Sequence, residues 1–161
     1  MYRIGFGSDI HRLEAGRRLI LGGVEIDSDF GAVGHSDADA LLHAVTDAVL
    51  GALALGDIGS HFSDKDERWK NADSLVFLKH TIELMKEKGF SVVNLDSTIH
   101  LEKPKLRPVI DRIRENLARA LEIEIEYVSV KAKTGEGVDA VGKIEAVKAE
   151  AVVLLQTTAS K

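Results

Sequence analysis

Three side chains in this sequence have the types and the spacing of a metal site. Asp9 and His11 lie two residues apart in an alternating segment, and His43 lies in a long apolar segment farther along the chain. Side chains two residues apart on a strand point to the same side, so Asp9 and His11 can reach one ion together. With His43 they form an Asp-His-His set that leaves a fourth coordination position open, which is typical of a catalytic zinc site.

Each part of this set also has a simpler interpretation. Asp9 could accept backbone hydrogen bonds at a strand end, with His11 lying exposed beside it. His43 could be an ordinary core histidine that is hydrogen-bonded by Asp39 or Asp47, four residues away on the same stripe of a helix. The choice depends on how the segments around these residues fold.

A long helical pattern lies within residues 34–59. From residue 38 to residue 55 nearly every position is apolar, and the exceptions fall four apart: Asp39, His43, Asp47 and Gly51. This predicts a buried helix with one short acidic stripe, ended by Gly-Asp-Ile-Gly at residues 56–59. We expect Ser36 to be its N-cap, just after His35, and the free N–H groups at its start to attract phosphate.

Two segments near the N-terminus have strand patterns. Tyr2, Ile4 and Phe6 alternate with Arg3 and glycines, the period of a strand with one buried face. Residues 17–27 are expected to form a β-hairpin about the Gly-Gly dipeptide at 22–23, which suits a tight turn. After the buried helix, residues 60–73 are polar and acidic, and we expect a mobile surface loop there.

Two further helices are predicted. One should begin at Asp73 or Ser74 and run to Lys88, with Gly89 after its end. The next follows the breaks at two prolines, 104 and 108, and its expected buried stripe is Ile110, Ile113, Leu117 and Leu121.

Three strands are predicted in the second half of the chain. They span residues 90–101, 125–134 and 143–156. The first should bury Val93, Leu95, Ile99 and Leu101, and show Asp96, Thr98 and His100 on its other face. The second should bury Val128, Val130 and Ala132.

The element order predicts an α+β fold with a single mixed β-sheet and helices packed on one face. The other face then needs cover. The last predicted strand carries the small residues Ala146, Ala149 and Ala151, so we expect that face to pack against copies of the same chain.

Composition limits the remaining possibilities. At 161 residues with 45% hydrophobic residues, we expect one domain spanning 1–161. The net charge of −5, with dispersed Lys and Arg, argues against a nucleic-acid partner. There is no cysteine, so any metal must be held by His, Asp or Glu. No apolar run is long enough to span a bilayer, so we expect no membrane association and a cytoplasmic location.

From residue 3 to about residue 155 the sequence resembles the 2-C-methyl-D-erythritol 2,4-cyclodiphosphate synthase family. The resemblance rests on five stretches: DIH at 9–11, GHSDADALLHAVTDAVLGA at 34–52, GDIGSHFSD at 56–64, the PK pair at 104–105 and KTGE at 133–136. It implies a lyase of the non-mevalonate isoprenoid pathway. In that reaction the 2-phosphate of 4-CDP-2-C-methyl-D-erythritol 2-phosphate attacks the β-phosphorus, which forms a cyclic diphosphate and releases CMP.

The resemblance also implies the cofactors and the assembly. One zinc ion per subunit would lie on Asp9, His11 and His43, and a magnesium or manganese ion would lie on Glu136. Two divalent ions would reduce the repulsion between the reacting phosphates. The family forms homotrimers with active sites between adjacent subunits, which would cover the second sheet face.

Roles for other side chains follow from the same resemblance. His35 and Thr134 would stabilise the transition state by hydrogen bonds to phosphate oxygens, assisted by Ser36. The methylerythritol diol would contact Asp57, Ile58 and Gly59, under a lid made of Phe62, Ser63, Asp64, Lys65 and Asp66. The cytosine pocket would lie along residues 101–107, including Leu101 and Lys105, and the nucleotide phosphates would lie beside Lys133. Gly135 would also belong to the substrate-binding residues.

Three departures from the family's motifs bear on ligand binding. Members often read T-T-T-E where residues 133–136 read K-T-G-E, and F-P-D where residues 62–64 read F-S-D. Ala140 and Lys143 replace a Phe and an Arg that line the trimer's central cavity, where some members hold an isoprenoid diphosphate. The altered segment around Gly135 and Ala140 motivates a second functional hypothesis, a non-catalytic zinc protein that senses isoprenoid phosphates. A third functional hypothesis is a metal-dependent phosphoesterase.

Overall fold

The computed structural model describes residues 1–63 and 65–158, and its centre is one five-stranded sheet. The strands are β1 (Tyr2–Ala15), β4 (Phe30–Ala32), β5 (Phe90–His100), β6 (Val128–Lys133) and β7 (Ala146–Thr157), in the spatial order β4-β1-β7-β5-β6. β5 and β6 run parallel, whereas the other neighbouring pairs are antiparallel. The sheet is therefore mixed, and the predicted α+β class is confirmed.

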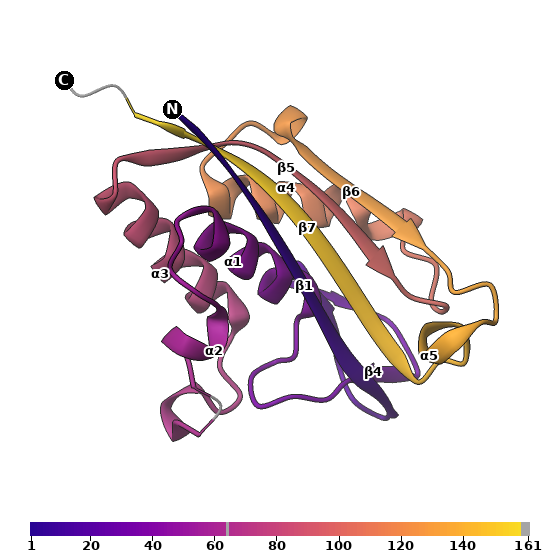
Figure 1. Ribbon diagram of the computed structural model, residues 1–161. Helices are drawn as coiled ribbons and strands as arrows, with labels where there is room; N and C mark the ends of the chain where they lie inside the picture. Colours follow the sequence, from indigo (N-terminus) through magenta and orange to yellow (C-terminus); the bar gives the residue numbers. More distant parts are fainter. Residues whose placement is uncertain (64, 159–161) are drawn as a thin grey trace.

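Three long helices lie on one face of this sheet, behind the strands in Figure 1. They are α1 (Ala40–Ala52), α3 (Ser74–Glu87) and α4 (Ile110–Leu121). α1 packs against β1 and β7, and α4 packs against β6. Asp73 caps α3 as predicted, and the predicted stripe of α4 is buried: Ile110, Ile113, Leu117 and Leu121.

The predicted hairpin is a separate two-stranded sheet of β2 (Leu19–Leu21) and β3 (Val24–Ile26). Its turn consists of Gly22 and Gly23, with φ of 62° and 72°. Glycine adopts these angles without a Cβ penalty, so the dipeptide identified the turn correctly.

β1 buries the opposite face from the one that its alternation predicts. Ile4 and Phe6 are 71% and 61% exposed, whereas Gly5 and Gly7 are buried against α1. A Cβ on Gly5 would lie 1.8 Å from the carbonyl oxygen of Ala48, so the strand and the helix meet backbone to backbone. The prediction was wrong because glycine carries no hydropathy signal that marks it as buried.

A β-bulge between Val92 and Asn94 changes the facing of β5. Val92 is buried and Val93 is half-buried, so the prediction that Val93 faces the core was wrong. An extra residue in one strand reverses the alternation on either side of it, and hydropathy alone does not locate it. Beyond the bulge, Leu95 and Ile99 are buried as predicted.

The expectations for the alanines of β6 and β7 were also wrong. Ala132 is exposed and lines a pocket at the end of β6. All three alanines of β7 are buried. Ala149 and Ala151 lie on the helix side of the sheet, where α1 packs against β7, whereas Ala146, the partner of Arg12, lies on the opposite face by strand alternation. Ala149 and Ala151 therefore accommodate a helix of the same chain, and they do not mark an oligomer surface.

Two short helices occur where the sequence predicted a helix stop and a mobile loop: α2 (Ile58–His61) begins before that loop, and η1 (Glu67–Trp69) lies within it. Three other short helices, η2 (Arg107–Val109), η3 (Ile125–Tyr127) and α5 (Asp139–Gly142), were not predicted, because one turn is too short for a periodic pattern. β7 begins at Ala146, after α5, and not at residue 143. Across the described residues, every helix is too short or too polar to cross a membrane.

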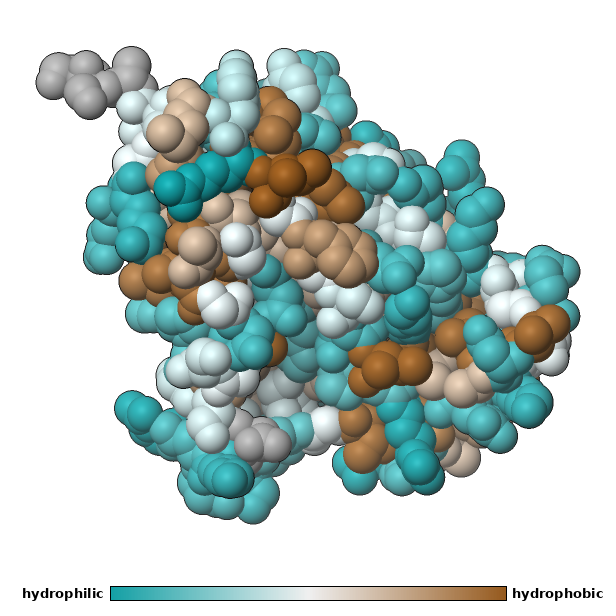
Figure 2. Space-filling view, in the orientation of Figure 1, coloured by the Kyte–Doolittle hydropathy of each residue, from teal (hydrophilic) through white to brown (hydrophobic). Residues whose placement is uncertain are grey.

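The second face of the sheet carries no helix from the described residues (Figure 1). Ile4, Phe6, Ile10 and Val152 project from it and are 37–71% exposed. Figure 2 looks onto this face and shows brown side chains along it among teal ones. Phe6 and Val152 are direct partners across β1 and β7, so their side chains adjoin. We call these four side chains the open-face patch.

Candidate metal centre

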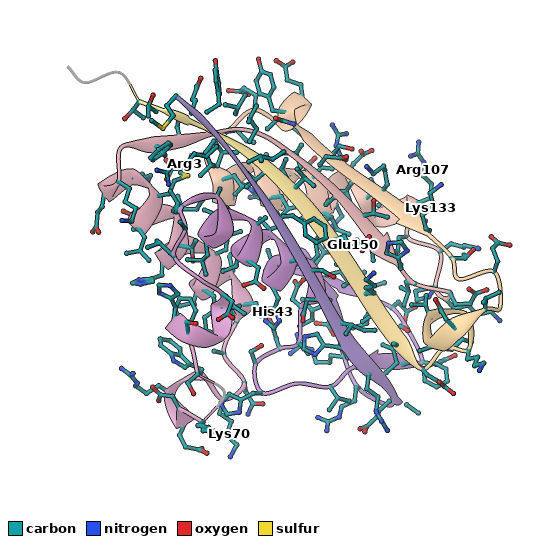
Figure 3. All side chains as sticks on the ribbon, viewed as in Figure 1. Arg3, His43, Lys70, Arg107, Lys133 and Glu150 are labelled. Atoms are coloured by element: carbon teal, nitrogen blue, oxygen red, sulfur yellow. The ribbon has the colours of Figure 1, made fainter. Side chains whose placement is uncertain are left out.

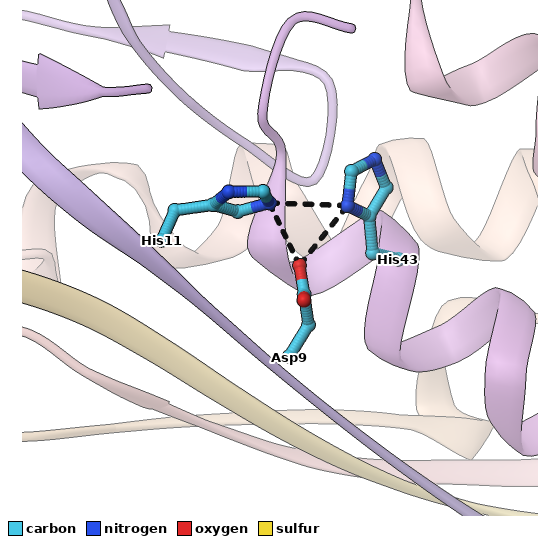
Figure 4. A group of neighbouring side chains, drawn as sticks. All are labelled: Asp9, His11 and His43. Atoms are coloured by element: carbon cyan, nitrogen blue, oxygen red, sulfur yellow. Dashed lines mark hydrogen bonds and ion pairs between the residues drawn. The ribbon is translucent and has the colours of Figure 1, made fainter. Parts of the chain in front are cut away.

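Asp9, His11 and His43 meet at one point between β1 and α1 (Figure 4). Asp9 Oδ2 lies 2.9 Å from His11 Nε2 and 3.0 Å from His43 Nδ1, and the two nitrogens are 3.2 Å apart. Ligand atoms held tetrahedrally at about 2.1 Å from a zinc ion are separated by roughly 3.4 Å, so this spacing fits a divalent metal. The structure thus brings the predicted ligand set together, and His11 is not an isolated exposed histidine.

The close approach of β1 and α1 places these ligands. Gly5, Gly7, Asp9 and His11 alternate along the face of β1 that packs on α1. The glycines let the helix backbone approach the strand, and the two ligands that follow then point toward His43. Gly5 and Gly7, which made the hydropathy prediction for β1 wrong, are therefore the residues that allow the metal ligands to meet.

Each imidazole is held at the nitrogen that points away from the site. His11 Nδ1 lies 3.0 Å from the carbonyl oxygen of Val33, which can only accept, so the proton is on Nδ1 and the lone pair of Nε2 faces Asp9. His43 Nε2 lies 2.8 Å from Ser74 Oγ and 3.2 Å from Ser36 Oγ. Neither serine was predicted as a partner of His43.

The acidic residues on the helix stripe have other partners, so the core-histidine interpretation of His43 is wrong. Asp47 accepts a hydrogen bond from the Ile58 N–H at 2.7 Å, which joins α1 to the start of α2. Burial raises the pKa of Asp47, against the lowering effect of that N–H group. The imidazole of His43 is bonded instead to Asp9 at one nitrogen and to Ser74 at the other.

Asp39, and not Ser36, caps α1. Asp39 Oδ1 accepts from the N–H of Leu42 at 3.0 Å and of Gly22 at 2.9 Å, and Oδ2 accepts from Gly23 at 2.7 Å. Burial raises the pKa of Asp39 to about 6, although these three N–H groups act to lower it. Asp and Ser are both good N-caps, so the sequence alone could not decide where the helix begins.

The charges at the metal centre suit a cation. Burial acts to raise the pKa of Asp9, but without a metal ion each imidazole can carry a proton on the nitrogen that faces Asp9. The resulting hydrogen bonds from His11 and His43 outweigh burial and hold the pKa of Asp9 well below its usual range. The pKa of His11 is raised despite burial, because the imidazolium form, protonated on both nitrogens, donates from Nε2 to Asp9. The neutral form keeps the Nε2 lone pair, which is the form that can bind a metal. Asp9 is therefore an ionised ligand throughout the neutral pH range.

A pocket of about 390 Å³ adjoins the ligands His11 and His43. Five of the predicted substrate residues line it: His35, Ser36, Ile58, Gly59 and Phe62. Trp69 and Phe77 complete the wall and pack around Phe62, with ring centroids 5.4 and 4.7 Å from it. Sequence reasoning missed both, because an aromatic residue near an amphipathic helix is usually core.

The predicted lid lies next to this pocket. His35 Nε2 donates to the carbonyl oxygen of Asp66 at 3.1 Å, and the Asp66 carboxylate caps η1 and pairs with Arg68. Ser63 and Lys65 are exposed, and Asp64 lies outside the described residues. Asp57 caps α2 and accepts hydrogen bonds from the backbone and hydroxyl of Ser60, at 2.9 and 2.6 Å.

Three of the predicted nucleotide residues, Leu101, Lys105 and Lys133, line a separate pocket of about 430 Å³, together with the predicted catalytic residue Thr134. The two pockets have no lining residue in common. β7 and β5 separate β1 from β6, which corresponds to three strand spacings or about 14 Å. In Figure 3, Lys133 lies on the opposite side of these strands from His43. A single chain therefore does not bring the two predicted halves of the site together.

The loop after β6 carries the predicted second metal ligand. Thr134 Oγ1 donates to Glu136 Oε1 at 2.7 Å, and the N–H of Gly135 donates to Glu102 Oε2 at 2.8 Å. A Cβ on Gly135 would lie 2.4 Å from the backbone nitrogen of Gly142, so a threonine does not fit this loop path. The departure at Gly135 thus matches the local backbone. Ala140 is half-buried in α5, and Lys143 is exposed after it.

A sequence model of the YgbB family matches residues 2–156 of this chain. The 2-C-methyl-D-erythritol 2,4-cyclodiphosphate synthase of Solibacter usitatus is 54% identical over 154 residues, covering 96% of this chain and 97% of that protein. The protein of the same name from Fusobacterium nucleatum is 55% identical over 156 residues, covering 97% and 98%. A solved structure of such a synthase in a CDP-bound form is 42% identical with a TM-score of 0.89, covering 96% of this chain and 100% of that one.

Proposed function

Because this chain belongs to the YgbB family of 2-C-methyl-D-erythritol 2,4-cyclodiphosphate synthases, we propose that it cyclises 4-CDP-2-C-methyl-D-erythritol 2-phosphate in the non-mevalonate isoprenoid pathway. An oxygen of the 2-phosphate attacks the β-phosphorus and forms the new P–O bond. The bond from that phosphorus to the oxygen of the departing nucleotide breaks, and CMP leaves. The observation that carries the proposal is the convergence of Asp9, His11 and His43 beside a pocket lined by His35 and Ser36.

Zinc is the metal that these three ligands suit best. Two imidazole nitrogens and one carboxylate oxygen match its preference for borderline ligands, and three protein ligands leave a position open for substrate. A zinc ion bound there supplies positive charge to a phosphate oxygen. Glu136 offers a carboxylate, the ligand type that magnesium and manganese prefer, for the second divalent ion.

His35 and Thr134 bind phosphate oxygens in this proposal. The Nε2 proton of His35 is now shared with the Asp66 carbonyl, so a phosphate oxygen must compete with that carbonyl for it. Substrate binding would then release Asp66 from His35 and let the proposed lid rearrange over the diol. Asp57 accepts from the diol hydroxyl groups, and the start of α2 at Ile58 and Gly59 contacts the same group.

The site is completed by a second subunit in a homotrimer. The open-face patch gives the sheet an apolar surface that another copy can cover. The two separate pockets of one chain become one site if a neighbour places its Thr134 and Lys133 beside this chain's His43. Intersubunit sites therefore account for both the uncovered sheet face and the divided set of substrate residues.

The activity test follows CMP and the cyclic product by phosphorus NMR, with zinc and magnesium present. We expect CMP and cyclodiphosphate in equal amounts, and no product after chelation. Reaction in oxygen-18 water separates cyclisation from hydrolysis, because only a phosphoesterase would place solvent oxygen in the product. Failure to release CMP with both metals bound would contradict the proposal, and tight substrate binding without turnover would favour a sensor.

The shared site is tested by mixing two inactive proteins. His43→Ala and Thr134→Ala each damage one half of the site, and reassociated mixtures contain some sites with both halves intact if the halves come from different chains. We expect partial recovery of activity after subunit exchange. If each site lies within one chain, the mixture stays inactive.

Assembly itself is tested at the open-face patch. Phe6→Glu places a charge on this patch and should reduce the trimer in sedimentation measurements. Val76→Glu is the matched control, because Val76 is 47% exposed on α3, on the helix side of the sheet. Equal sedimentation of both variants and the unmodified protein would exclude the open-face patch as the interface.

A further inference from the structure

Ser74, the first residue of α3, reaches across to the metal ligand His43. Ser74 is fully buried, and its Oγ lies 2.8 Å from His43 Nε2. On its other side, Ser74 Oγ donates a short hydrogen bond to Asp37 Oδ1. His43, Ser74 and Asp37 therefore form a continuous chain of hydrogen bonds that leads away from the metal centre.

Asp37 is held in place by the backbone. Its Oδ2 accepts from the N–H of Ser74 at 3.1 Å, and its Oδ1 accepts from the N–H of Asp39 at 3.2 Å. The N–H of Asp37 donates to the carbonyl oxygen of Ala72 at 3.0 Å. The carboxylate cannot turn away from Ser74 without losing the bonds from the N–H groups of Ser74 and Asp39, so the Asp37 end of this hydrogen-bond chain is fixed.

The hydrogen bonds from His43 through Ser74 to Asp37 can run in only one donor-to-acceptor direction. A carboxylate is an acceptor only, so the single hydroxyl proton of Ser74 goes to Asp37. The lone pairs of Ser74 Oγ then face His43, and His43 Nε2 must carry a proton to bond to them. In a neutral imidazole the other nitrogen, Nδ1, keeps its lone pair. Nδ1 is the atom that lies 3.0 Å from Asp9 Oδ2 in the metal centre.

We propose that Ser74 and Asp37 are positioning residues that hold His43 in the orientation and tautomer that binds metal through Nδ1. The inference rests on the proposed metal site. It adds the two residues that favour the His43 tautomer with a proton on Nε2 and a lone pair on Nδ1. Partners of this kind orient the ring and raise its basicity, and their loss weakens metal affinity by about 10–100-fold in other sites.

Ser36 provides a second, weaker contact to the same nitrogen. Its Oγ lies 3.2 Å from His43 Nε2 and accepts from the N–H of Ala38 at 3.3 Å. Ser36 Oγ also lies 3.3 Å from Ser74 Oγ, which can accept the Ser36 proton because the proton of Ser74 goes to Asp37. Ser36 can support the imidazole when Ser74 is removed, but it does not impose the direction of the bond.

The test measures zinc affinity by chelator competition in the full-length protein. Ser74→Ala should raise the dissociation constant for zinc by about 10-fold or more. Asp37→Asn should act in the same direction, because an amide can donate to Ser74 Oγ and free the hydroxyl proton to point at His43. Nitrogen-15 NMR of the zinc-loaded protein supplies an independent signal, a slowly exchanging proton on His43 Nε2 that Ser74→Ala should lose.

Asp73→Ala is the matched control. Asp73 caps the same helix, through a 2.8 Å bond from the N–H of Leu75, but it makes no described contact with His43. This variant should lower the melting temperature while zinc affinity and the His43 proton stay unchanged. A purely structural role for Ser74 would make both variants behave alike.

The outcomes separate this inference from the metal site itself. If the unmodified protein binds zinc and Ser74→Ala binds it equally well, the positioning role is wrong while the metal site stands. Equal weakening by Asp73→Ala would also overturn the role, because helix fraying would then explain it. An unmodified protein that binds no zinc would overturn both.

Discussion

Gly7 of β1 and Ala44 of α1 lie so close that a Cβ on Gly7 would be 2.0 Å from the Ala44 carbonyl oxygen. Gly7 is two residues before the ligand Asp9, and Ala44 directly follows the ligand His43. The contact therefore sets the separation between the strand that carries two ligands and the helix that carries the third.

Gly7→Ala should destabilise the protein and weaken zinc binding together. The added methyl group must push α1 away from β1, because its nearest neighbour is backbone and not a movable side chain. Overpacking of this kind costs about 1–3 kcal/mol in free energy of unfolding. Thermal denaturation and zinc content would measure the two effects. Gly51→Ala is the control, since a Cβ there would lie 3.8 Å from the Phe6 carbonyl oxygen, an ordinary contact.

His43→Ala should remove zinc and activity and leave the protein folded. α1 is held by its buried apolar face, and alanine is a better helix former than histidine. Metal analysis and circular dichroism would check both parts. His80→Ala changes an exposed histidine outside the ligand set and should keep its zinc. Stoichiometric zinc in His43→Ala would show that the ligand set is wrong.

Glu136→Gln should keep zinc but weaken activation by magnesium or manganese. A glutamine carbonyl oxygen can still accept the Thr134 hydrogen bond, so the substitution changes mainly the charge. A hard divalent ion binds a carboxylate much better than a neutral amide. Activity would be measured against the concentration of the second metal at saturating substrate. An unchanged activation curve would remove Glu136 from the site.

The pKa of Asp39 predicts one component of the pH dependence of stability. Its pKa is about 6 in the folded protein, against 3.8 ordinarily, so the folded state binds the proton more tightly. This stabilisation is complete below pH 3.8 and is lost as the pH rises through 6. Its full contribution to the free energy of unfolding is about 3 kcal/mol.

Urea unfolding of the metal-free protein between pH 4 and pH 7 would measure this effect. Asp39→Asn should lose this component of the pH dependence. It should also be less stable across this pH range, because its amide N–H₂ would face one of the N–H groups that donate hydrogen bonds to the carboxylate. Identical pH profiles for the two proteins would contradict the prediction.

The residues at the proposed trimer centre predict weak binding of a prenyl diphosphate. Lys143 meets a phosphate as a point charge without the two-pronged geometry of Arg, and Ala140 adds little apolar contact. Calorimetry with geranyl diphosphate, with CDP blocking the active site, should show tighter binding after Ala140→Phe with Lys143→Arg. Tight binding by the unmodified protein with no gain in the double variant would contradict this prediction.

The features that sequence predicted correctly are those with a local pattern. The hairpin turn at Gly22, the cap of α3 at Asp73 and the buried stripe of α4 each depend on neighbouring residues only. Asp9 and His11 were placed on one side of a strand for the same reason. Their meeting with His43 required a long-range contact, which the residue types suggested and the fold provides.

The features that sequence missed depend on tertiary contacts. The buried face of β1 is set by α1, which approaches glycines that have no hydropathy signal. Ser74 looked like an ordinary helix start, because its contact with His43 lies across the fold. The separation of Thr134 from His35 follows from strand order, which single-chain periodicity does not encode.

The pairing of β1 with β7 has a consequence for how the protein is made. All three proposed metal ligands lie in the first part of the chain and leave the ribosome early, whereas Asp9 is aligned by Ala149 in the last strand of the sheet. A nascent chain thus carries the complete set of ligands long before it carries the strand that holds two of them in register. Zinc capture should therefore follow completion of β7, and truncation of that strand should abolish the site without removing a ligand.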